Sequence, residues 1–393
     1  MNRIKTIYVK ELREMLRDKR VRSSALFGPM MMVILMLLGF GTLISTLSQP
    51  SNLKIHVIQA DNSFVKGLRG SKMNVLTVAS LEEGKKMVED GKARIVLDFD
   101  KDFDAKLASG QAAKVDAYYN PNEQLSEIAL SAITKSFDAA NRKSAAALLE
   151  AKGVSPELAQ PLKLHSVEVG KAKKGSDLLV GFLPYLIVIW AFYGGMGIVS
   201  DLVAGEKEKN TLETLLITPT RRTEIALGKL LALTTICLSS VVSALAGVYV
   251  VAASHAPVIE KVFSQGVGLA PEALLTIAVV IIPTALFFAS LMLAISAFAR
   301  NARESQSYLA LVSFVILMPA IASQFIGFTD AGSQSWVGFV PVLGTANAIR
   351  HAMFNQYDLG SIAATTLVSI VLATIATTVV VKLFNREEIL VRV

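Results

Sequence analysis

The chain has 393 residues, of which 52% are hydrophobic and 18% are charged. Ordinary soluble domains carry about 25% charged residues, so this composition and a mean hydropathy of +0.50 argue against a soluble enzyme. The only cysteine is Cys237, which excludes an intramolecular disulfide and a cysteine-based zinc site.

Residues 1–23 carry eight Lys and Arg, and apolar residues recur among them at helical spacing: Ile4, Tyr8, Leu12 and Met15. This pattern predicts an amphipathic helix that lies at the cytoplasmic surface of a membrane. The alternative is a basic flank that only orients the first span.

Along the chain, clusters of charged residues are separated by six charge-free tracts of at least 23 residues each. About 20 apolar residues cross a bilayer, so each tract predicts a transmembrane helix. We expect the first span, 24–46, to stay as an anchor, because it is longer than the apolar part of a signal peptide. The tracts are Ser23–Leu53, Leu178–Ser200, Leu230–Ile259, Ala273–Ala299, Ser305–Thr329 and Leu359–Val381.

The orientation follows from the short connecting segments. Eighteen Lys and Arg fall in both terminal segments and in the second and fourth connections, against two in the third and fifth. Positive charge stays in the cytoplasm, which predicts that both termini are cytoplasmic. Residues 47–177 then face outward, because long translocated domains are exempt from the charge rule.

Residues 47–177 predict a separate α/β domain, since strand and helix patterns alternate along them. Ser80 and Glu83 form a capping box at the start of a helix. The predicted strands are 53–57, 94–99 and 115–119, and the predicted helices are 81–90 and 123–151.

Four aspartates inside this domain alternate like calcium ligands: Asp98, Asp100, Asp102 and Asp104. An EF-hand needs Gly at its sixth position and Glu at its twelfth, where this chain has Phe103 and Ser109. We therefore interpret the run as a solvated turn that leads into a helix carrying Leu107.

Residues 330–358 are uncharged over most of their length but are interrupted by glycines and a proline. They are too broken for a span, so we expect short re-entrant or interfacial helices at the outer end of a pathway. A plain extracellular loop is the alternative.

No catalytic residue, cofactor site or metal site is predicted in this chain. A phosphate-binding GxxxxGK[ST] loop is absent, because Leu230 follows Gly228 and Lys229. The four histidines show no ligand spacing. Small residues at Gly194 and Gly195 favour close helix packing over nucleotide binding.

The most informative stretch follows the second span and reads AGEKEKNTLETLLITP over 204–219. Its leucines recur at helical spacing opposite glutamates, and Pro219 stops the helix. A rod of this length cannot span a bilayer, but it suits a cleft on a soluble partner.

The run GEKEKNTLETLLITPTRRTEIALGK resembles the coupling region of type-2 ATP-binding-cassette permeases, in particular the sodium-export (Nat-type) branch, and KELREMLRDKR near the N-terminus also fits. The resemblance implies an α-helical integral membrane protein with six transmembrane helices, an extracytoplasmic domain inserted after the first, spans two to six within 178–393, and a coupling helix at about 205–218. The coupling positions it implies are Gly205, Glu206, Glu208, Thr211, Leu212, Glu213, Leu215 and Leu216.

The same resemblance implies a bacterial cytoplasmic membrane protein that pairs with itself or a related permease. A separate ATPase subunit would bind ATP and Mg²⁺ and hydrolyse the nucleotide, so this chain would be no enzyme. Membrane lipid is an expected contact and nucleic acid is not.

The substrate stays open between Na⁺ and a drug-like or lipid-like compound. Ion pathways usually carry ionisable groups inside the membrane, and none of the six tracts has one near its middle. Two other functions fit the sequence less well. A membrane-anchored sensor needs a larger cytoplasmic output domain, and a secondary transporter usually shows buried charge and repeated halves.

Overall fold

The computed structural model describes residues 3–47, 54–58, 61–71, 73–109, 111–121, 124–155, 178–209, 211, 219–254, 270–326, 334–353 and 356–386. The chain divides into two compact units. The first comprises Met1–Gly41 with Gly170–Val393, and the second comprises Thr42–Val169. Each unit has a hydrophobic core of its own.

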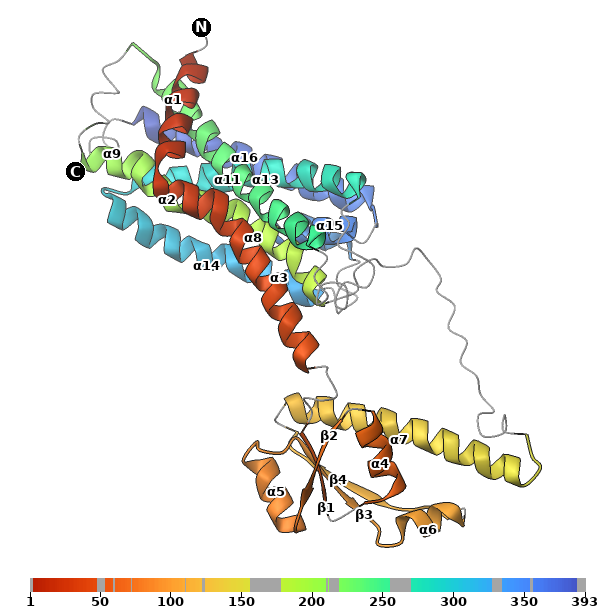
Figure 1. Ribbon diagram of the computed structural model, residues 1–393. Helices are drawn as coiled ribbons and strands as arrows, with labels where there is room; N and C mark the ends of the chain where they lie inside the picture. The colour runs from red at the N-terminus through yellow and green to blue at the C-terminus, as the bar shows by residue number, and fades with distance from the viewer. Residues whose placement is uncertain are drawn as a thin grey trace. The chain divides into compact units, whose positions relative to one another are not determined.

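The first unit is helical, and among the described residues six of its helices are long and apolar enough to cross a membrane. Its elements are α1 (Arg3–Arg17), α2 (Lys19–Val21), a π-helical segment (Arg22–Phe27), α3 (Gly28–Leu47), α8 (Leu178–Ser200), a π-helical turn (Asp201–Gly205), α9 (Glu206–Glu208), α11 (Arg222–Ala253), α13 (Pro271–Phe298), α14 (Ala302–Ile326), a 3-10 helix (Ser335–Phe339), α15 (Leu343–Met353) and α16 (Leu359–Asn385) (Figure 1). The six candidate spans are Lys19–Gly39, Phe182–Glu208, Arg222–Ala253, Pro271–Phe298, Ala302–Ser323 and Leu359–Asn385. The prediction of a helical protein with six such segments is therefore confirmed.

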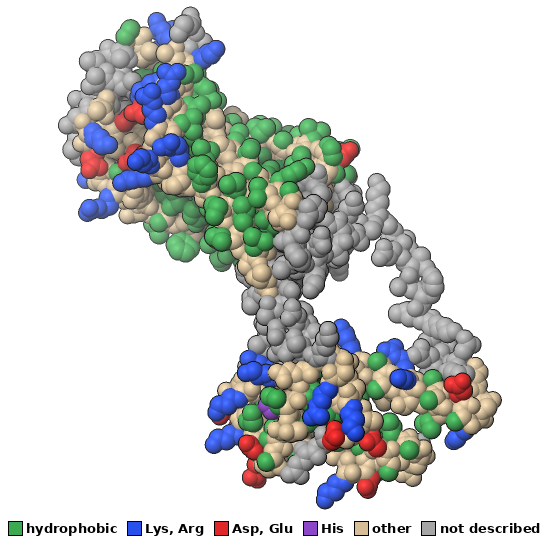
Figure 2. Space-filling view, viewed as in Figure 1, with side chains coloured by type: hydrophobic (Ala, Val, Ile, Leu, Met, Phe, Trp, Pro, Cys, Tyr) green, Lys and Arg blue, Asp and Glu red, His purple; other side chains and the backbone are tan. Residues whose placement is uncertain are grey.

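Helices α8 and α13 lie at the centre of this unit. The apolar windows of the spans that contain them are 61% and 56% buried, whereas that of α16 is 22% buried. Helix α13 packs against α16, α11, α8 and α15. Lys and Arg side chains gather at the end of the unit that holds α1, and hydrophobic side chains cover the surface beyond it (Figure 2).

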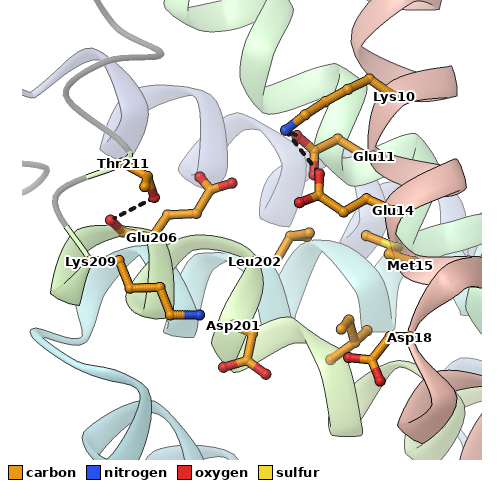
Figure 3. Close-up of a pocket in the computed structure, with 11 residues that line it drawn as sticks. Lys10, Glu11, Glu14, Met15, Asp18, Asp201, Leu202, Glu206, Lys209 and Thr211 are labelled. Carbon is orange, nitrogen blue, oxygen red and sulfur yellow. Dashed lines mark hydrogen bonds and ion pairs between the residues drawn. The ribbon is translucent and has the colours of Figure 1, made fainter.

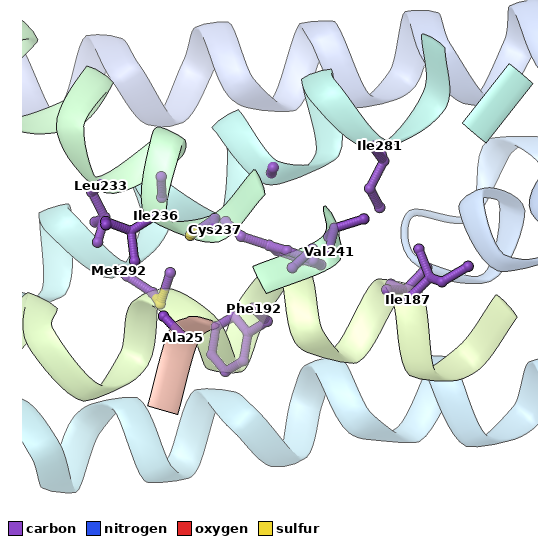
Figure 4. Packing of buried hydrophobic residues seen from close by; sticks show 14 of the residues in the cluster. Ala25, Ile187, Phe192, Leu233, Ile236, Cys237, Val241, Ile281 and Met292 are labelled. Atoms are coloured by element: carbon purple, nitrogen blue, oxygen red, sulfur yellow. The ribbon is translucent and has the colours of Figure 1, made fainter. Parts of the chain in front are cut away.

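The contact between α8 and α11 depends on two glycines of α8. A Cβ added at Gly194 would lie 2.0 Å from the Ser240 Oγ, and one added at Gly195 would lie 2.6 Å from the Cys237 Sγ. The two backbones approach too closely for any side chain at these positions, and Cys237 lies in the core between them (Figure 4). The predicted packing role of these glycines is confirmed.

Helix α15 and the 3-10 helix before it lie in the segment that was predicted to hold short helices, so the helices are confirmed and their re-entrant or interfacial position stays a prediction. Most residues of α15 are buried, including Thr345 and Asn347, and the helix packs against α8, α13, α14 and α16. Just before it, Val342 has φ of 70°, which is rare for a β-branched residue and marks a tight turn. The function of this segment at the outer end of a pathway stays a prediction.

The second unit contains a four-stranded sheet in the order β2-β1-β3-β4. Strands β1 (Lys54–Ile58), β2 (Asn74–Val78) and β3 (Ile95–Phe99) are parallel, and β4 (Val115–Tyr119) is antiparallel to β3. Helices α4 (Ser63–Gly70), α5 (Leu81–Glu89), α6 (Phe103–Ala108) and α7 (Gln124–Ala151) complete it. The predicted strands and helices are present, while β2 and α4 are additions; the extracytoplasmic side and the domain boundaries stay predictions.

Helices cover both faces of this sheet. Ile55, Val57 and Ile95 pack with residues of α4 and α7, and Val96 packs with residues of α5 on the opposite face. The aspartate run bonds within the domain: Asp100 pairs with Lys106 at 2.7 Å, and Asp104 accepts a hydrogen bond from the Ser63 hydroxyl at 2.6 Å. Among the described residues, no cluster of His, Cys, Asp and Glu is arranged to hold a metal ion.

We expect the isolated segment 52–172 to fold and to lose stability between pH 7 and pH 5. His56 is buried in β1, and burial lowers its pKa below the ordinary value, with the charge of Lys54 acting in the same direction. As the pH falls below about 6.5, His56 is protonated in the unfolded chain but stays neutral in the folded chain. The free energy of unfolding therefore decreases by at most about 1.4 kcal/mol for each pH unit.

Urea unfolding followed by circular dichroism at each pH measures this loss. His56→Leu should flatten the profile, while His165→Leu, which follows all four strands in the sequence, should leave it unchanged. A profile that stays steep in His56→Leu, or an unfolded spectrum of 52–172 at pH 7, contradicts the prediction.

Candidate functional site

The predicted coupling segment begins where α8 ends. The π-helical turn Asp201–Gly205 follows α8 directly and leads into the short helix α9. Ser296 joins this region to α13, because its hydroxyl donates to the Val199 carbonyl at 2.7 Å and accepts from the Ala204 N–H at 3.2 Å. π-helical turns inside long helices are frequent at functional sites.

Lys229 of α11 joins this segment to two other helices. Its side chain is fully buried, and its ammonium donates to Glu206 Oε1 at 2.7 Å, to Glu11 Oε1 at 3.2 Å and to the Leu202 carbonyl at 3.0 Å. An ammonium has three donors, so all of them are used. One buried cation thus links α1, α9 and α11, and we call Glu11, Glu206 and Lys229 the buried ion triad.

Helix α1 supplies Glu11, whose side chain is 3% exposed. The helix packs along α11, where a Cβ added at Gly228 would lie 2.6 Å from an Ile7 methyl group, so the glycine permits the close approach. The Tyr8 hydroxyl lies 3.2 Å from Thr235 Oγ1. Contact with α11 rather than with lipid alone therefore decides which face of α1 is buried.

Lys10 lies beside the triad and stays charged. Burial favours its neutral form, but the charges and hydrogen bonds of Glu11 and Glu14 outweigh this and raise the pKa of Lys10 above its ordinary value. Lys10 Nζ lies 3.1 Å from an oxygen of each glutamate. The excess negative charge near the triad is thereby reduced.

Lys207 and Glu208 join the same segment to the turn between α13 and α14. Lys207 is buried, and its ammonium donates to the carbonyls of Ala297 and Ala299 at the end of α13. A cation at a helix C-terminus satisfies free carbonyls and the helix dipole. Glu208 Oε2 accepts from the Ala302 N–H at 3.3 Å, at the start of α14.

A cavity of about 640 Å³ opens between α1 and the end of α8 (Figure 3). Acidic side chains prevail along its wall, and the labelled residues of α1 and of 201–211 face each other across it. The lining residues are Lys10, Glu11, Glu14, Met15, Asp18, Ile198, Asp201, Leu202, Glu206, Lys209 and Thr211.

The structure describes half of the predicted coupling residues. Gly205 is buried, Glu208 is exposed, and Thr211 Oγ1 donates to the Glu206 carbonyl at 3.2 Å. Glu206 bonds to Lys229 of its own chain. The other predicted positions lie outside the described residues, and contact of the whole set with a partner stays a prediction; they are Leu212, Glu213, Leu215 and Leu216.

Sequence reasoning missed Glu11, Lys207 and Lys229. The signal for Glu11 was present, because it falls within the apolar stripe of α1, next to Leu12 and one turn before Met15. The sequence indicates only that Lys229 and Lys207 add positive charge to a cytoplasmic segment, since nothing local distinguishes a buried lysine near a span end from a solvated one.

Comparison with known proteins agrees with this architecture. Residues 20–382 match the family described as ABC-2 family transporter protein. The chain is also 27% identical over 369 residues to the ABC transporter permease protein NatB of Bacillus subtilis (strain 168), which covers 92% of each chain. No solved structure matches. Because the family match covers nearly the whole chain, and six candidate spans lie within the helical unit, the chain belongs to the ABC-2 family and is a permease subunit of an ABC transporter.

Proposed function

We propose that this permease exports its substrate by alternating access, and that a separate ABC ATPase drives it through residues 205–218. The observation that carries the proposal is the double attachment of the segment 199–208. The buried ion triad joins it to α1 and α11, and Lys207 with Glu208 joins it to the α13–α14 turn. A push on the segment would therefore reach several spans together.

The proposed orientation has both termini in the cytoplasm of a bacterium, with the ATPase at the α1 end. The basic side chains at that end support it (Figure 2). We further propose a homodimer or a pair of related permeases, because six spans enclose only a thin-walled path.

For the substrate, we place a drug-like or lipid-like compound ahead of Na⁺. Among the described residues, every Asp, Glu, Lys and Arg of the six candidate spans lies within two turns of a span end. In the third span, the hydroxyls of Thr234 and Ser240 donate to carbonyls of their own helix, and Ser243 donates to the Leu26 carbonyl. These hydrogen bonds give the hydroxyls a part in helix packing, and the order of the two substrates rests on the placement of the charged residues. Na⁺ remains the second candidate through the sequence resemblance.

Glu213→Lys tests the proposed ATPase contact. We expect the variant to insert into the membrane normally, to lose most co-purification with the ATPase, and to lose at least tenfold in ATP-driven transport, because reversing a charge at an interface costs both attraction and desolvation. Transport is measured in vesicles with a fluorescent amphipathic cation and, separately, with ²²Na⁺.

Glu272→Lys is the matched control. This exposed glutamate lies at the N-terminal end of α13, opposite the end that Lys207 contacts. Unchanged ATPase yield with Glu213→Lys would contradict the proposed docking segment. ATP-driven transport of ²²Na⁺ and not of the dye would reverse the order of the two substrates.

A further inference from the structure

An apolar groove lies between α13, α14 and α16, near the end of the unit where α13 finishes. Its volume is about 400 Å³, and Phe298 in its wall is 56% exposed. The Tyr308 hydroxyl donates to Glu304 Oε1 at 2.7 Å, which leaves the tyrosine ring as groove surface. The wall is formed by Ala294, Ile295, Phe298, Tyr308, Val379 and Leu383.

Three exposed basic residues lie close in the chain to residues of the groove wall. Arg300 follows Phe298 by two positions, and its backbone N–H donates at 2.7 Å to Glu304, the carboxylate that also accepts from the Tyr308 hydroxyl. Lys382 precedes Leu383, and Arg386 lies three positions after Leu383, where its N–H bonds to the Leu383 carbonyl. Among the described residues, none of these three side chains forms an ion pair. We call Arg300, Lys382 and Arg386 the basic rim.

We propose that the groove holds an acyl chain of an anionic phospholipid whose phosphate lies at the basic rim. The apolar wall suits a hydrocarbon chain, and Lys and Arg beside a groove between spans attract anionic headgroups. A second copy of this chain fits less well, because a two-fold contact centred on the groove would bring the two basic rims close together. The site therefore matches a ligand with one charged end and one apolar end.

This site adjoins the coupling segment. Phe298 is flanked by Ala297 and Ala299, whose carbonyls accept from Lys207, and Ala302 donates to Glu208. A lipid in the groove would stabilise the α13–α14 turn against which the segment rests. Only the assignment of this lipid to the cytoplasmic leaflet rests on the proposed orientation.

A tryptophan placed in the groove tests the proposal directly. In a Trp190→Phe, Trp336→Phe background, Phe298→Trp is reconstituted into vesicles that contain brominated phosphatidylglycerol or brominated phosphatidylcholine. We expect phosphatidylglycerol to associate at least about fivefold more strongly, the factor that one basic residue near the headgroup supplies. Phe314→Trp is the matched control, because Phe314 is 65% exposed on α14 away from the groove, and it should show no preference.

Neutralising the basic rim with Arg300→Gln, Lys382→Gln and Arg386→Gln should reduce the preference of Phe298→Trp to that of the control. If Phe298→Trp does not fold, Val379→Trp on the opposite wall serves instead. Equal quenching by the two lipids, a preference that survives in the neutral rim, or protection from both lipids by a second copy would each overturn the proposal. The quenching experiment contains no ATPase and no nucleotide. Its result is therefore independent of whether the proposed export function is correct.

Discussion

Replacing Lys229 with Met is expected to lower the free energy of unfolding by about 3–5 kcal/mol, because Glu206 loses its cation and Glu11 keeps only Lys10 at the edge of the cluster. Glu11 is almost fully buried, so water cannot take the place of the ammonium. The methionine side chain fills nearly the same volume, which separates the loss of charge from the loss of packing.

The effect is measured as the midpoint of thermal unfolding in detergent, followed by intrinsic fluorescence of Trp190 and Trp336. Lys209→Met is the matched control, since Lys209 is an exposed lysine of the same region, and we expect its midpoint to stay within about 1 °C of the parent. A midpoint of Lys229→Met equal to that of Lys209→Met would show that the triad adds nothing to stability.

The triple variant Glu11→Gln, Glu206→Gln, Lys229→Met should recover much of the lost stability, because replacing every member of a buried ionic cluster removes the unpaired charge. It should not recover transport if the linkage of α1, α9 and α11 carries motion from the ATPase. Full transport by this variant would restrict the triad to a folding role.

Gly194→Val should prevent correct packing of α8 against α11. The first added carbon alone would lie 2.0 Å from the Ser240 Oγ, less than any non-bonded contact allows, so the helices must separate or a backbone must shift. We expect a loss of about 3 kcal/mol and little monodisperse protein by size-exclusion chromatography.

Gly39→Val provides the comparison within another candidate span, because no atom lies within 4 Å of a Cβ added there. It should give the parental yield and elution profile. Adding Ser240→Gly to Gly194→Val should restore part of the yield. Equal yields of Gly194→Val and Gly39→Val would contradict the close approach of α8 and α11.

Much of the fold could be predicted from the distribution of charge. Ionisable residues are costly inside a bilayer, so the spans appear in the sequence as charge-free tracts, and α15 could be expected because glycines and Pro341 interrupt its tract. Strand β2 was not predicted because Asn74–Val78 is mostly exposed and lacks an apolar face that alternates along the strand. Helix α4 escaped because its two glycines weaken the helical pattern.

The candidate site could be predicted only where its pattern is local. The glutamates and leucines after the second span occur within one short stretch, and their helical spacing is visible. The buried ion triad joins Glu11 to Lys229 across 218 positions, and long-range pairing of that kind has no periodicity in the sequence. Lys207 likewise gains its function from the end of α13, which only the fold brings near.

Cys237 gives this permease a native chemical probe. The thiol is fully enclosed where α11 meets Gly195 of α8, and it is the only one in the chain. Maleimide modification therefore requires the two helices to part. The rate of this modification during turnover would measure how often the helices separate, in protein that carries no substitution. While the helices stay packed, a cysteine introduced at the surface would be the only thiol that reacts with a spectroscopic label.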